Sequence, residues 1–158
     1  LFSGITWHYN MGRAFAYTFC QTGGMGNNIP ENLFTEYDEN GNYVRGIEGR
    51  PLEYMFQGTF QDSGVNMLPA KLFAGIRGEP AEGMFSGTFH WNRVGDIPEG
   101  LFAGIVGAPA KDMFASTFSR GDSGSSLTKI PKGLFAGISG EPAQGMFNGT
   151  FNGFKSVC

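Results

Sequence analysis

The stretch Ile-Pro-x-Gly-Leu-Phe-Ala-Gly-Ile-x-Gly-x-Pro-Ala-x-x-Met-Phe-x-x-Thr-Phe occurs with little change at residues 97–118 and again at residues 130–151. A third copy occupies residues 68–89, and more divergent copies precede it. Self-similarity at a period of roughly 30 residues is typical of solenoids, in which stacked units bury a continuous core. We therefore expect a single repeat domain. Its expected units are residues 1–28, 29–67, 68–96, 97–129 and 130–158.

Phenylalanine dominates the core that these repeats predict. The chain contains 16 Phe among 158 residues, and they recur at fixed repeat positions. Ordering a unit of about 30 residues costs at least roughly 30 kcal/mol of backbone entropy, more than its buried Phe side chains return. No unit is therefore expected to fold without a neighbour. We expect equivalent phenylalanines, such as Phe73, Phe102 and Phe135, to lie above one another in a continuous column.

The repeat pattern also predicts local structure. An apolar pair precedes each proline, as with Val94 and Ile97, and favours a short strand that the proline ends. Proline then starts a short helical turn, and a second short helix or 3₁₀ segment is expected over residues 80–89. Parallel pairing of the short strands from neighbouring units would form a narrow sheet along one side.

The residues Leu127-Thr128-Lys129-Ile130-Pro131, followed by Phe135 and Ile138, resemble the L-T-x-I-P-x-x-x-F-x-x-L portion of leucine-rich repeats. The repeated Met-Phe-x-Gly-Thr-Phe-x-Gly segment is similar to the A-F-x-G-C-x-x-L unit of BspA-like leucine-rich-repeat surface proteins of bacteria. Here Phe replaces most Leu, and no asparagine recurs at a fixed place.

This resemblance implies an α/β solenoid: a leucine-rich-repeat-like right-handed superhelix with short parallel strands and short helical turns. A right-handed β-helix-like solenoid stays open as the alternative. The resemblance also implies an extracellular or cell-surface bacterial protein that binds other macromolecules.

Residues 35–49 form the largest insertion between repeat copies. Asn40-Gly41 lies there between short alternating runs, a pattern that predicts a two-stranded hairpin. Asp38, Asn40 and Asn42 alternate as calcium ligands do, but the glycine and glutamate of an EF-hand loop are not in register. We therefore interpret these side chains as turn residues.

The two cysteines, Cys20 and Cys158, belong to the first and last units. If units stack at a strand spacing of about 4.8 Å, four steps place these cysteines roughly 19 Å apart. Because a disulfide requires Cα atoms within about 7 Å, we expect them not to pair with each other. Two cysteines without a nearby histidine also make no zinc site.

Composition and charge argue against several classes of function. A net charge of -3 provides no basic surface for nucleic acid. No run of 18 apolar residues predicts a membrane span, and residue 1 already lies inside a repeat unit, where no signal peptide is expected. The histidines, His8 and His90, lie in different loops without a Ser/Asp set around them, so we expect no enzyme, cofactor or metal.

Exposed aromatic and arginine side chains in the connecting loops are the candidate contacts, because protein interfaces are enriched in them. The alternative is that they only shield local core. Arg120-Gly121-Asp122 also matches an integrin-binding tripeptide, a short pattern that often arises by chance and is also ordinary turn sequence. The predicted binding residues are Trp7, His8, Tyr9, Tyr37, Tyr43, Trp91, Arg93, Arg120, Gly121 and Asp122.

The sequence thus predicts a non-catalytic protein-binding or adhesion module with a protein or cell-surface ligand. Neither end carries the polar cap that solenoids usually need. We therefore expect either part of a longer array or ends that something else covers. A structural subunit that stacks end to end into an extracellular fibre is the alternative, since an interface that does not close propagates.

Overall fold

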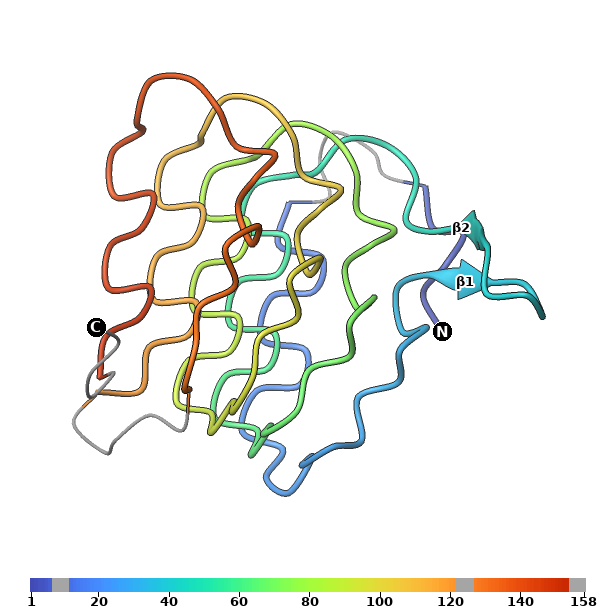
Figure 1. Ribbon diagram of the computed structural model, residues 1–158, viewed down its shortest axis with the longest axis horizontal. Helices are drawn as coiled ribbons and strands as arrows, with labels where there is room; N and C mark the ends of the chain where they lie inside the picture. The colour runs from blue at the N-terminus through green and yellow to red at the C-terminus, as the bar shows by residue number, and fades with distance from the viewer. Residues whose placement is uncertain (7–11, 122–126, 154–158) are drawn as a thin grey trace.

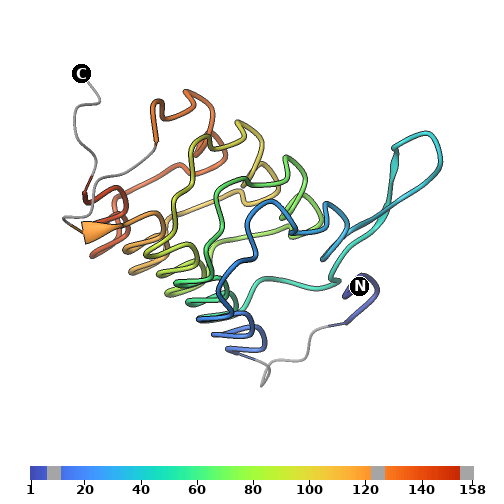
Figure 2. The same ribbon diagram turned by 90° about the horizontal axis from the view of Figure 1, so that it is seen from below.

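The computed structural model describes residues 1–6, 12–121 and 127–153 (Figure 1). The chain winds through a series of coils that lie side by side and follow the sequence repeats, as both views show (Figures 1 and 2). One wall of this stack consists of equivalent segments, here called the turn segments. They are residues 12–21, 53–62, 82–91, 111–120 and 144–153.

Regular secondary structure is nearly absent from the described residues. It consists of two strands, β1 (Glu36–Tyr37) and β2 (Tyr43–Arg45). The predicted helix over 80–89 is not formed, because Gly83 and Gly87 have φ values of 57° and 62°. Residues in the left-handed region interrupt a right-handed helix. The predicted parallel strands before the prolines are not formed in the described residues; of their positions Val65 makes an isolated parallel bridge, with Gly26. Other isolated parallel bridges lie elsewhere in the repeat, as between Gly78 and Ile105.

The turn segments are chains of consecutive tight turns. In residues 53–62 the backbone enters the left-handed region at every fourth residue: Tyr54, Gly58 and Asp62 have φ values of 55°, 57° and 51°. Every second N–H closes a turn onto the carbonyl three residues earlier, as Met55 does onto Leu52 at 3.2 Å. Positive φ at the third residue is the geometry of a type II turn, and it alternates here with turns that lack it.

The remaining N–H groups of each turn segment bond to the next coil. Tyr54 donates to the carbonyl of Glu82 at 2.8 Å, and Phe60 donates to the carbonyl of Thr88 at 2.9 Å. The same parallel pattern joins each turn segment to its successor. Alternate backbone groups are therefore satisfied within a coil and between coils, which is what a buried backbone without helices or strands requires.

The interior of the stack is built from phenylalanine columns. Equivalent rings of adjacent coils lie from 5.3 Å (Phe19 to Phe60) to 6.1 Å (Phe102 to Phe135) apart, in stacked orientation. Such distances suit offset aromatic pairs. The predicted column through Phe73, Phe102 and Phe135 is confirmed. The three columns are Phe2-Phe34-Phe73-Phe102-Phe135, Phe15-Phe56-Phe85-Phe114-Phe147 and Phe19-Phe60-Phe89-Phe118-Phe151.

A ladder of buried threonines runs beside these columns. The hydroxyl of Thr88 donates to the carbonyl of Phe56 in the preceding coil at 2.8 Å, and Thr117 donates equivalently to Phe85 at 2.9 Å. Thr59 and Thr150 repeat the contact. The Thr of the repeated Thr-Phe pair thus forms a recurring polar ladder, although no asparagine recurs at a fixed repeat position.

The inserted hairpin is confirmed at its predicted place. Strand β1 pairs antiparallel with β2, and the hairpin projects from one side of the stack (Figure 1). Asp38 organises its turn: its Oδ1 accepts from the N–H groups of Asn40 and Asn42 at 2.9 and 2.8 Å. Hydrogen bonds from Asn42 hold the pKa of Asp38 below its usual value. The Asp38 carboxylate therefore accepts hydrogen bonds within the hairpin turn, as expected for a turn residue.

The predicted separation of the two cysteines cannot be compared with the structure, because Cys158 lies outside the described residues. Cys20 is a free thiol. Among the described residues, no helix has the length and apolar composition that a membrane span requires.

Candidate functional site

The hairpin carries one candidate surface, here called the hairpin surface: Tyr37, Tyr43, Val44, Lys71 and Arg77. Tyr43 and Val44 of β2 are 40% and 52% exposed. The guanidinium of Arg77, from the next repeat, lies 4.1 Å from the centre of the Tyr43 ring. Lys71 Nζ lies 4.4 Å from the Tyr37 ring and 3.4 Å from the carbonyl oxygen of Gly41. Cations of one repeat therefore hold the aromatic rings of the insertion in place.

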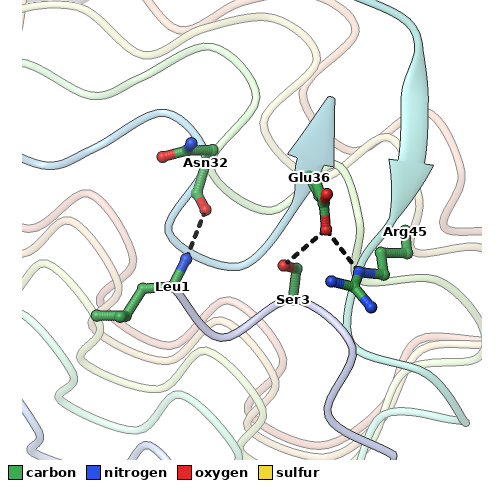
Figure 3. Close-up of polar contacts among 5 residues, drawn as sticks. All are labelled: Leu1, Ser3, Asn32, Glu36 and Arg45. Carbon is green, nitrogen blue, oxygen red and sulfur yellow. Dashed lines mark hydrogen bonds and ion pairs between the residues drawn. The ribbon is translucent and has the colours of Figure 1, made fainter. Parts of the chain in front are cut away.

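The base of the hairpin is tied to the first residues of the chain (Figure 3). Glu36 Oε2 accepts from Arg45 Nε at 2.5 Å and from Ser3 Oγ at 3.5 Å. The amino group of Leu1 donates to the carbonyl of Asn32 at 3.1 Å. Exposed contacts of this kind each contribute little to stability, so their main effect is to orient the two strands.

Tyr37 and Tyr43 differ in what they present to solvent. The ring of Tyr37 is partly buried under Lys71, its hydroxyl is buried, and burial raises its pKa. Tyr43 lies on the open side of the hairpin. Of the two tyrosines predicted as contacts, Tyr43 is the one that offers a surface, and Tyr37 mainly shields local structure.

A second candidate surface, here called the Trp91 corner, consists of His90, Trp91, Arg93, Arg120 and Gly121. Trp91 is 48% exposed, and its backbone N–H donates to the carbonyl of Ser119 at 2.8 Å. Its indole lies against Gly121, since a Cβ built there would be 3.5 Å from the ring. The ring of His90 meets the indole edge-on, with centres 5.6 Å apart.

Arg120 is the unexpected member of this corner, because the residue is only 8% exposed. Burial, and secondarily the positive charge of Arg93, lower its pKa. Its backbone N–H is bonded to the carbonyl of Asn152 at 2.9 Å. An integrin-binding tripeptide needs an accessible arginine. The low exposure of Arg120 argues against a displayed adhesion motif at Arg120-Gly121-Asp122, and Asp122 lies outside the described residues.

The predicted contacts therefore separate into three groups. Trp91, Arg93, Arg120 and Gly121 meet at one corner, whereas Tyr37 and Tyr43 lie on the hairpin. Trp7, His8, Tyr9 and Asp122 lie outside the described residues. Lys71 and Arg77 are not among the residues predicted from the sequence, and both occupy variable positions of the repeat next to the insertion. A charged residue at such a position is the only signal that could have identified them.

In the described ranges, no set of three or more His, Cys, Asp or Glu residues is placed to hold a metal ion. His90 Nδ1 is buried without a hydrogen-bond partner there, and burial lowers the pKa of the ring. Comparison of the chain with protein-family models, curated proteins and solved structures gave no match.

Proposed function

We propose that the chain is a non-catalytic module that binds a protein partner through the hairpin surface. The observation that carries this proposal is the position of Tyr43 and Val44. They are exposed on an insertion that only one repeat carries, and Arg77 supports the Tyr43 ring from the neighbouring repeat. Insertions into single repeats of a solenoid often form its binding face. Tyr and Arg together are also the side chains on which interfaces most depend.

The same proposal assigns the chain to a secreted or surface-displayed bacterial protein of leucine-rich-repeat type. The repeat motifs that resemble BspA-like proteins support this assignment, as does the parallel bonding between successive coils. The right-handed superhelix belongs to the proposal as well. A β-helix-like solenoid remains the alternative class.

Deletion of residues 36–45 tests the hairpin's role. It joins Thr35 to Gly46 and produces Leu-Phe-Thr-Gly-Ile, which matches Leu-Phe-Ala-Gly-Ile at residues 72–76. The shortened chain should therefore keep its stack. The experiment measures binding of the intact chain, the deletion and Tyr43→Ala to a panel of purified secreted and cell-surface proteins. A partner that binds only the intact chain supports the proposal; a panel without any binder, or a partner indifferent to the deletion, contradicts it.

An end-to-end structural subunit is the second candidate function. It is favoured by an apolar cavity of about 480 Å³ beside the last turn segment, whose lining includes Phe135, Met146 and Phe147. Phe147 is 41% exposed there, although its column partners Phe85 and Phe114 are fully buried. Sedimentation velocity over a range of concentrations decides this question: a chain that stays monomeric at high concentration is not such a subunit.

A further inference from the structure

Two cations lie next to each other on one face of the hairpin. Tyr37 of β1 is directly opposite Tyr43 of β2, so both side chains share a face, with Cβ atoms about 5 Å apart. Lys71 Nζ lies 4.4 Å from the centre of the Tyr37 ring, and the Arg77 guanidinium lies 4.1 Å from that of the Tyr43 ring. The cross-strand pair of rings therefore carries a pair of positive charges.

The repeat itself does not require a cation at either position. Lys71 and Arg77 belong to the third copy, which faces the insertion. The two following copies have uncharged residues at the equivalent positions: Gly100 and Gly133 for the lysine, Val106 and Ser139 for the arginine. The two cations are therefore a property of the hairpin surface and not of the stack.

Neither cation is neutralised within the part of the chain that the structure describes. None of the ion pairs there involves Lys71 or Arg77. Arg77 is exposed, and its guanidinium donates no hydrogen bond to the described residues. Lys71 Nζ donates one, at 3.4 Å, to the carbonyl oxygen of Gly41. Contact with a ring occupies no N–H group, so both cations keep donors for an anion.

The charge of the insertion narrows the class of anion. Residues 35–49 contain four carboxylates and one guanidinium, so a negative field surrounds the two cations. A nucleic acid or a sulfated glycan, with charges along its whole length, is repelled by such a field. A peptide segment with two carboxylates avoids this repulsion. Tyr43, which is 40% exposed, offers apolar surface to the rest of that segment.

The geometry of an extended peptide fits a pair of neighbouring cations. Side chains of residues i and i+2 in a strand point to the same side, about 7 Å apart. Two carboxylates with this spacing reach two adjacent cations at once. The planar N–H groups of Arg77 suit a carboxylate in particular, because they bind both of its oxygens in a fork.

We propose that the hairpin surface binds an extended acidic peptide segment, in which carboxylates of residues i and i+2 contact Lys71 and Arg77 and an apolar side chain packs on Tyr43. This inference rests on the function proposed above, and it adds the chemistry of the partner.

Selection from a library of random peptides displayed on phage tests the proposal. The target is the intact chain, and the chain without residues 36–45 removes peptides that bind elsewhere. We expect the hairpin-dependent peptides to be enriched, relative to the unselected library, in Asp or Glu pairs separated by one residue. In a synthetic peptide from this set, replacing both acids by their amides should weaken binding at least about tenfold. Added salt should weaken it as well, because exposed charges are screened.

Three variants locate the contacts. Arg77→Gln and Lys71→Gln should each weaken binding of the acidic peptide at least about threefold. Lys132→Gln removes an exposed charge from the last repeat unit and should change nothing.

A double-mutant cycle separates direct contact from an effect on the ring. If Arg77 contacts a carboxylate, neutralising that carboxylate should cost less affinity in Arg77→Gln than in the unchanged protein. If Arg77 only orients Tyr43, the two losses add. The same cycle applies to Lys71 and Tyr37.

Three results would overturn the inference and leave the proposed function standing, since the hairpin would still bind peptide. They are hairpin-dependent peptides without acidic enrichment, full affinity after both acids are neutralised, and additive losses in both cycles. A selection without any hairpin-dependent peptide also overturns the inference. The proposed function is then decided by the panel of purified proteins, which present folded surfaces as well as extended segments.

Discussion

The hydroxyl of Thr88 donates to the carbonyl of Phe56, one coil away, at 2.8 Å, and the threonine side chain is fully buried. The same hydroxyl lies 2.8 Å from the carbonyl of Phe85 in its own coil. One side chain thus joins two coils beside the phenylalanine column. Equivalent threonines make the same hydrogen bond along the stack. The ladder thus satisfies buried backbone carbonyls of the phenylalanines whose rings form the column.

Replacement of Thr88 by valine keeps the shape of the side chain and removes the donor. We expect the free energy of unfolding to fall by about 1–3 kcal/mol, because the carbonyl of Phe56 loses a buried hydrogen bond. Thr18→Val is the matched control, since Thr18 occupies the same repeat position but is exposed. It should change stability by less than about 0.5 kcal/mol. Urea denaturation measures both, and equal losses would refute the role of the ladder.

Phe85 and Phe147 belong to the same column and differ in burial. Phe85 is fully buried between Phe56 and Phe114, whereas Phe147 is 41% exposed. Phe85→Ala should therefore lower the free energy of unfolding by about 3–5 kcal/mol. Phe147→Ala should cost clearly less, because it leaves a smaller cavity. Chemical denaturation compares the two, and a larger loss at Phe147 would contradict the packing described.

Gly83 and Gly87 have similar backbone angles but different surroundings. A Cβ on Gly83 would lie 2.3 Å from the ring of Tyr54, whereas one on Gly87 would meet only ordinary contacts at 3.8 Å. Gly87→Ala should cost about 1–2 kcal/mol for left-handed backbone alone. Gly83→Ala should cost more, because it also displaces Tyr54. Combined with Tyr54→Ala, the excess should disappear; an excess that persists in this double-mutant cycle would show that Tyr54 is not its cause.

His90 predicts a pH dependence of stability. Burial lowers its pKa in the folded chain, so the unfolded chain binds more protons below about pH 6.5, the usual histidine value. The contribution of neutral His90 to folding stability is therefore complete above about pH 6.5. It is lost as the pH falls from 6.5 to the lowered pKa of the folded chain. His90→Gln should reduce the change in unfolding free energy between pH 7 and pH 5. An identical pH profile for both proteins would rule out His90 as the source.

The sequence predicted the features that depend on apolar periodicity. The spacing of Phe73, Phe102 and Phe135 predicted a column, and Asn40-Gly41 predicted the hairpin. These predictions succeeded because each follows from a local turn preference or from burial at a fixed repeat position.

The turn segments could not be predicted, because their backbone depends on tertiary contacts. Tyr54, Asp62 and Ser116 adopt positive φ although they are not glycines. Local preference disfavours this conformation, and the hydrogen bonds to the next coil compensate for it. The burial of Arg120 could not be predicted either, because the Arg-Gly-Asp pattern does not indicate which coil packs against Arg120. Lys71 and Arg77 were missed because their aromatic partners belong to another repeat.

The central claim is that equivalent phenylalanines of successive coils stack directly on one another. Nuclear Overhauser effects between ring protons of Phe56, Phe85 and Phe114 test it most directly, in protein labelled on phenylalanine rings and assigned with single Phe→Leu variants. The account predicts cross-peaks between Phe56 and Phe85 and between Phe85 and Phe114, whose ring centres are 5.5 and 5.6 Å apart. It predicts none between Phe56 and Phe114. Absence of the first two cross-peaks in folded protein would contradict the stacked arrangement.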